Sequence, residues 1–145
     1  MNEDFVTYEL AKKLKEKGFN CELPYAMYNE IGQFCLLTTS APYHVCESCY
    51  KYREYYDYND FDKNDFIAPT ISQVLKWLRQ EKKILVEIAL SPEGYRHIIY
   101  TGLCCTNTSS ASYYSFDGFY NHENNYMTYE QAALSGIEYV IDNLI

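Results

Sequence analysis

The segment ILVEIALSPEGYRHIIYT, residues 84–101, contains a first run in which the apolar side chains Ile84, Val86, Ile88 and Leu90 recur at every second position, and a second run, Tyr95–Thr101, in which the chain returns. A period of two is typical of β-strands that bury one face, and the Ser-Pro-Glu-Gly sequence between the runs is typical of a tight turn. We therefore expect an antiparallel hairpin here. If the turn sets the register, His97 lies opposite Ile88 and on the same sheet face as Ile99.

Helical periodicity on both sides of this hairpin sets the fold class. Apolar residues recur at three- and four-residue spacing in three segments, residues 5–17, 69–82 and 128–144. A second hairpin is predicted over residues 25–38, around an Asn-Glu-Ile-Gly turn. The order helix–hairpin–helix–hairpin–helix predicts an α+β fold in which helices cover an antiparallel sheet, as a single domain over residues 1–145.

Two stretches, residues 39–68 and 102–127, show neither period and are predicted as long loops. Both are rich in Tyr and Phe, which disordered segments generally lack. We therefore expect these loops to pack on the domain, and part of residues 50–58 to form a further strand.

The charge balance excludes several classes of function. The chain carries 20 acidic and 12 basic residues, with a formal net charge of -8. General nucleic-acid binders need a basic surface that displaces counterions, so we expect none here. No apolar run is long enough to span a bilayer, and the acidic first residues do not resemble an export signal. These features predict a cytoplasmic protein without membrane contact, whose six cysteines are reduced.

The motifs of common enzyme classes do not occur in the sequence. It contains no nucleophile elbow, phosphate-binding loop, dinucleotide-binding glycine triad or His-Glu-x-x-His motif. His97, on a predicted sheet face, is expected to be a hydrogen-bonded core or rim residue rather than a base. We therefore expect no catalysis and no cofactor, unless the fold gathers a His/carboxylate or Cys/His cluster around His97 or Cys46.

The spacing His44-x-Cys46-x-x-Cys49 raises the question of a metal or redox site. Cys46 and Cys49 have the separation of half a zinc site, but a second ligand pair at matching spacing is missing. A redox pair needs a stabilised thiolate, which the acidic Glu47 between them disfavours. Two ordinary cysteines in an aromatic loop are the third interpretation, and we favour it.

Basic residues gather around the sole tryptophan of this acidic chain, on the second predicted helix and the following hairpin. Guanidinium groups and a free helix N-terminus bind phosphate or carboxylate, and aromatic faces stack on planar ligands. The alternative is a solvated helix face whose tryptophan covers the core edge. The pattern predicts a site for a small anionic, nucleotide-like ligand, with anion contacts from Thr70, Ser72, Arg79 and Arg96 and stacking on Trp77 and Tyr100.

The 17 tyrosines support a second hypothesis. A small core cannot readily satisfy so many hydroxyl groups, so several rings should be exposed for contact. The Tyr-rich acidic surfaces of residues 43–58 and 113–126 would then let the protein act as an adaptor or inhibitor that meets a basic protein partner. Exposed aromatic residues also suit a homo-oligomer.

Three sequence blocks, mostly in the predicted helices, carry a resemblance to a known group. They are Phe5–Glu9 with Leu14–Phe19, then Ala68–Arg79, and finally Thr128–Ala132 running into Gly136–Tyr139. In these blocks the chain resembles small uncharacterised proteins encoded by phages and mobile elements of gut Bacteroidetes. The resemblance covers about a third of the chain, leaves out the cysteine pair and brings no activity with it. It implies an accessory role, such as countering a host defence by sequestering a nucleotide signal or a defence protein.

Overall fold

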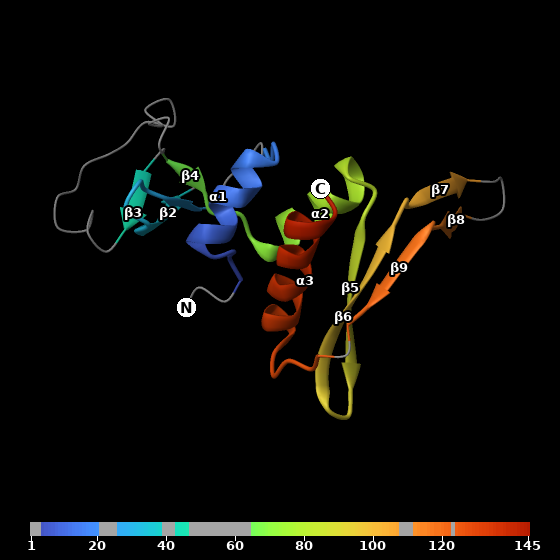
Figure 1. Ribbon diagram of the computed structural model, residues 1–145. Coiled ribbons are helices and arrows are strands. Elements are labelled where there is room, and N and C mark those ends of the chain that lie inside the picture. Colours follow the sequence, from blue (N-terminus) through green and yellow to red (C-terminus); the bar gives the residue numbers. More distant parts are fainter. Residues whose placement is uncertain (1–3, 21–25, 39–42, 47–64, 108–111, 123) are drawn as a thin grey trace. The chain divides into compact units, whose positions relative to one another are not determined.

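The computed structural model describes residues 4–20, 26–38, 43–46, 65–107, 112–122 and 124–145. The chain divides into two compact units, Met1–Thr70 and Ile71–Ile145, which are described separately (Figure 1). Each unit combines helix with antiparallel strands, which confirms the predicted α+β class. The expectation of one domain over the whole chain stays a prediction. Within the described chain, no helix has the length and apolar character needed to cross a membrane.

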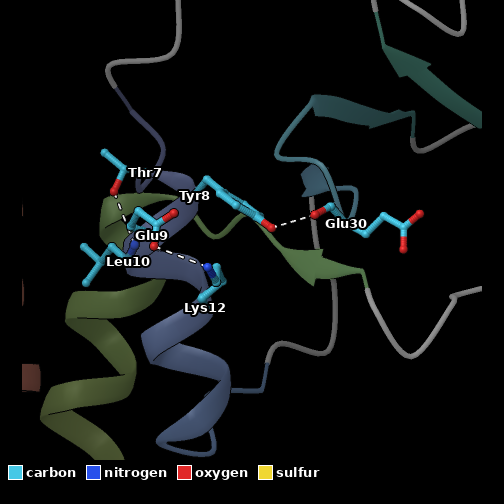
Figure 2. A network of polar contacts seen from close by, with 6 residues as sticks. All are labelled: Thr7, Tyr8, Glu9, Leu10, Lys12 and Glu30. Carbon is cyan, nitrogen blue, oxygen red and sulfur yellow. Dashed lines mark hydrogen bonds and ion pairs between the residues drawn. The ribbon is translucent and has the colours of Figure 1, made fainter.

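The first unit begins with helix α1, Tyr8–Glu16, inside the predicted helical segment. The helix starts later than predicted because Thr7 caps it: the Thr7 hydroxyl accepts a hydrogen bond from the Leu10 amide at 3.3 Å. Its buried stripe is Leu10, Ala11 and Leu14. Figure 2 shows this cap together with the hydrogen bond from the Tyr8 hydroxyl to the carbonyl oxygen of Glu30, which is 2.8 Å long and connects α1 to the turn at residues 29–32.

The sheet of the first unit has the strand order β3-β2-β1-β4, with all pairs antiparallel. The predicted hairpin is confirmed as β1, Ala26–Tyr28, and β2, Phe34–Thr38. Strands β3, Tyr43–Cys46, and β4, Phe66–Ile67, lie where a loop was predicted over residues 39–68. That prediction was wrong at these positions, because strands of four and two residues are too short to show a period. Residues 50–58 lie outside the described residues.

Aromatic side chains fill much of the space between α1 and this sheet. The rings of Tyr28 and Phe34 meet edge to face at 5.5 Å, and Tyr8 contacts both Tyr28 and Phe66 in the same way. The buried Tyr28 hydroxyl donates a 2.7 Å hydrogen bond to the carbonyl oxygen of Val6. Tyr28 therefore belongs to the core, Tyr8, Phe34 and Phe66 pack around it while half-buried, and backbone carbonyl oxygens accept hydrogen bonds from both tyrosine hydroxyls.

The second unit contains helices α2, Ile71–Glu81, and α3, Tyr129–Asn143, with a sheet of order β5-β6-β9. The predicted hairpin is confirmed as β5, Leu85–Ser91, and β6, Gly94–Thr101, and His97 pairs with Ile88 as expected. Helix α3 packs along β5 and β6, and α2 packs on α3 and β5.

Strand β6 pairs with β9, Gly118–Asn121. Beyond a kink, β6 is followed by β7, Cys104–Asn107, which pairs with β8, Ser112–Ser115, and β8 leads back into β9 (Figure 1). The loop predicted over residues 102–127 was therefore wrong for these strands. Thr101 pairs with Gly118, and Cys104 pairs with Ser115. Each of the two chain segments, the arms of this hairpin, therefore has two residues between these pairs, and these residues form the kink. Gly102 has a φ of +66°, and a Cβ there would overlap the Asp117 carboxyl group. This left-handed conformation at the kink favours glycine.

Helix α3 approaches the sheet closely at Gly136. A Cβ at this position would lie 2.7 Å from Val86 Cγ1 and 3.1 Å from His97 Cβ. Around it the helix buries apolar side chains that include Ile137, Val140 and Ile141. Helix α3 therefore covers the part of one face of the β5–β6 ladder that contains Val86, His97 and Ile99.

The N-terminus of α3 gives a first prediction. The Thr128 hydroxyl accepts a hydrogen bond from the Gln131 amide at 3.2 Å, as the Thr-x-x-Gln pattern predicts. Replacing Thr128 by Ala leaves that amide without its cap, and we expect a loss of about 1 kcal/mol in the free energy of unfolding. Urea denaturation measures it, and Thr128→Ser should keep most of the stability.

Candidate functional site

The β5–β6–β9 sheet has a second face, turned away from α3. Directly opposed residues of an antiparallel ladder share a face, and neighbours along a strand alternate between faces. His97 and Ile99 are buried on the α3 side, so Arg96, Ile98 and Tyr100 point to the other side. We call this side the aromatic face, formed by Leu85, Glu87, Ala89, Arg96, Ile98, Tyr100, Phe116 and Phe119.

Three rings meet at the end of the aromatic face nearest the kink. The Tyr100 ring lies 4.7 Å from Phe116 and 5.4 Å from Phe119, both edge to face. Phe116 is 51% exposed and Phe119 is 53% exposed. Large apolar rings this open to solvent are unusual in a folded core and typical of surfaces that contact something else.

Polar groups lie along the same face. Arg96 pairs with Ala89, and its guanidinium Nε is buried without a hydrogen-bond partner among the described residues. Burial, a hydrogen bond with Glu87 and the negative charge of that carboxylate raise the pKa of the Tyr100 hydroxyl above its ordinary value. Tyr100 therefore stays protonated at neutral pH and engages Glu87, while Arg96 keeps an unused donor.

The six residues predicted to bind an anion lie on different elements. Arg96 and Tyr100 come together on the aromatic face. Ser72 and Arg79 are exposed on α2, whose buried side packs on α3 and β5, so Arg79 and Arg96 do not share a face. Trp77 is buried at 9% exposure with Lys82 Nζ 5.0 Å from its ring centre, as the core-edge alternative predicts. Thr70 is the last residue of the first unit, where it bridges to Phe5.

Sequence reasoning missed Phe116 and Phe119 as site residues. Both lie in the stretch that was predicted as a loop, so no register connected them to Tyr100. No local period marks either residue, because β9, Gly118–Asn121, has only four residues and is recognised only through its pairing with β6.

No metal centre is assembled by the part of the chain that the structure describes, where no group of three His, Cys, Asp or Glu side chains comes together. Cys46 ends strand β3 and pairs with Cys35 in the ladder, whereas Cys49 lies outside the described residues. The zinc, redox and ordinary interpretations of this pair therefore all stay open.

His97 is buried as predicted, at 2% exposure, and the backbone of Ala132 lies close enough to favour its protonated ring, although not in good hydrogen-bond geometry. Neither ring nitrogen has a hydrogen-bond partner among the described residues, nor does the buried Nε2 of His122. The two imidazole centres are 4.6 Å apart, because His122 follows β9 at the position opposite His97. No carboxylate is seen to contact this pair in the described structure, so a general base oriented by an acid is not formed there.

Comparisons with known proteins assign the chain to no group. No protein family model matches it, and neither a curated protein nor a solved structure shows significant similarity.

Proposed function

We propose that the protein is a non-catalytic binding module and that the aromatic face is its recognition surface. The observation that carries this proposal is the meeting of the exposed Phe116 and Phe119 rings with Tyr100 on the face that also presents Arg96. Rings offer stacking area at low entropic cost, and a guanidinium group fixes an anion by paired hydrogen bonds. Binding a ligand through these groups requires no additional catalytic side chain.

The favoured ligand is small, anionic and aromatic, such as a nucleotide. Along a strand, the Cα atoms of Arg96 and Tyr100 are about 13 Å apart, and the arginine side chain shortens the gap. A nucleobase stacked on Tyr100 and Phe119 would place its phosphate within reach of Arg96. Such a ligand would keep its phosphate away from the Glu87 carboxylate, which the Tyr100 hydroxyl engages. In a phage or mobile element, the binding would withdraw a nucleotide signal from host defence.

Titration calorimetry with a panel of nucleotides and cyclic nucleotides tests this proposal. For the nucleotide that binds, Arg96→Ala should weaken affinity about 10–100-fold, because a charge-assisted hydrogen bond is lost. Arg79→Ala is the matched control and should bind normally, since Arg79 is exposed on α2. The proposal fails if no nucleotide binds, or if Arg79→Ala weakens binding and Arg96→Ala does not.

A protein partner is the second candidate, and the exposure of the rings favours it. Phe116 and Phe119 are each about half exposed, and both contact Tyr100 on the aromatic face. Interface centres are rich in such residues, and the net charge of -8 suits a basic partner. Affinity capture from host extract separates the candidates: a protein retained by the native chain and lost with Phe119→Ser supports a partner, and its absence supports the small ligand.

A further inference from the structure

The side of the sheet opposite the aromatic face contains a cluster of four titratable rings. His97 stacks on Tyr126 at 5.9 Å between ring centres and contacts His122 at 4.6 Å. His122 in turn meets the Tyr139 ring of α3 edge to face at 4.3 Å. The cluster therefore joins β6, the residues that follow β9, and α3.

The surroundings of His97 suit a neutral ring and not a charged one. The only carbonyl that favours the protonated ring is that of Ala132, among the described residues, and it forms no hydrogen bond of good geometry. Charged side chains are not seen facing the ring in the described structure, and its titratable neighbours are His122, Tyr126 and, beyond His122, Tyr139. The remaining neighbours are Ile88 of β5, Tyr95 and Ile99 of β6, and Gly136 of α3.

The elements that this cluster joins are weakly held otherwise. Strand β9 has four residues and pairs with β6 alone within the described sheet. Beyond it, Tyr126 is attached by two backbone hydrogen bonds with Tyr95, of 2.9 and 2.7 Å, and by its hydroxyl to Ser135 at 2.6 Å. A four-residue strand that is paired on one side only opens at a smaller free-energy cost than the core.

We propose that His97 and His122 form an acid-sensitive latch, which holds β9 and Tyr126 against β6 and α3 at neutral pH and releases them when an imidazole takes up a proton. A proton on His97 would put an unpaired charge among apolar groups, and a second on His122 would add repulsion at 4.6 Å. Opening brings both rings into water, where the charge is solvated.

The direction of the pH effect follows from the burial. Burial, and then the neighbouring His122, lower the pKa of His97 from the ordinary value of 6.5. The closed form therefore binds fewer protons than the open form below about pH 6.5. The stabilisation is complete above that pH and is lost as the pH falls, with the opening constant rising up to about tenfold per pH unit for one proton.

Hydrogen exchange of the Tyr126 amide, and of those β9 amides that point toward β6, tests the latch. After correction for intrinsic exchange, opening at about pH 5.5 should exceed that at about pH 7.5 by up to about tenfold, while amides in the middle of α2 keep their protection. The imidazole carbon resonances of the native protein should show His97 titrating below 6.5. This second measurement does not depend on any variant folding.

Substitutions identify the groups responsible. His97→Phe keeps a ring of similar size and cannot be protonated, so its opening should not change between the two pH values. His122→Gln removes the repulsion but not the burial, and should reduce the response without abolishing it. His44→Gln, in β3 of the first unit, is the matched control and should respond like the native protein. An unchanged response in His97→Phe, equal opening at both pH values, or a His97 pKa at or above 6.5 would overturn the proposal.

Discussion

Replacing Gly136 by Leu is expected to lower the free energy of unfolding by about 3 kcal/mol. Even the first added atom would lie 2.7 Å from Val86 Cγ1 and 3.1 Å from His97 Cβ. Val86 is branched at Cβ and belongs to a strand, so it has little freedom to move aside. The helix must therefore lift from the sheet, which opens the contact that buries Ile137. Urea denaturation followed by far-UV circular dichroism measures the loss.

A matched control separates the clash from the effect of adding a leucine to a helix. Gln131→Leu introduces the same side chain on the exposed side of α3 and should change stability by less than about 0.5 kcal/mol. Gly136→Ala should fall between the two, because its better helix propensity offsets part of the clash. If Gly136→Leu were as stable as Gln131→Leu, the close approach of α3 to the sheet would be refuted.

Replacing Leu14 by Ala is expected to lower the stability of the first unit by about 2–5 kcal/mol. Leu14 is 1% exposed at the C-terminal end of the buried stripe of α1. Truncation loses the transfer free energy of the removed carbons and leaves a cavity beside Leu10 and Ala11. Glu16→Ala, at an exposed position of the same helix, should leave the unfolding midpoint unchanged, and equal midpoints for the two variants would contradict the described core.

The same variant tests the expectation of a single domain. Trp77 lies in the second unit, and it is the only tryptophan in the chain, so its fluorescence reports on that unit. If residues 1–145 unfold as one domain, the fluorescence transition of Leu14→Ala should move together with the circular dichroism transition. A fluorescence transition that stays in place would instead mean that the two units unfold separately.

The sequence predicts those elements that are long enough to show a period. The hairpin of β5 and β6 and the helix α3 each run for seven residues or more, and their periods place Ile88 opposite His97 and Ile137 in the core. Strands of two to four residues, such as β4 and β9, show no period of their own. They form because a neighbouring strand offers unpaired backbone groups, which is information that the local sequence does not contain.

The candidate site was predictable in part for the same reason. Arg96 and Tyr100 belong to the long strand β6, and their common face follows from even spacing. Phe119 joins them through pairing between strands distant in sequence. Arg79 and Trp77 were grouped with Arg96 because they are near in the chain, but the helix turns Trp77 into the core and Arg79 to solvent. Residues that are close in sequence can point to opposite sides of a helix or a sheet.

The kink at Gly102 and Asp117 restricts how this protein can change its length during evolution. Two residues on each arm lie between the pairs Thr101–Gly118 and Cys104–Ser115, so the count is balanced across the bend. A single inserted or deleted codon in one arm would invert every side chain beyond it, whereas matched changes in both arms would preserve the pattern. Homologous genes should therefore differ in this arm by equal numbers of codons before and after the tip.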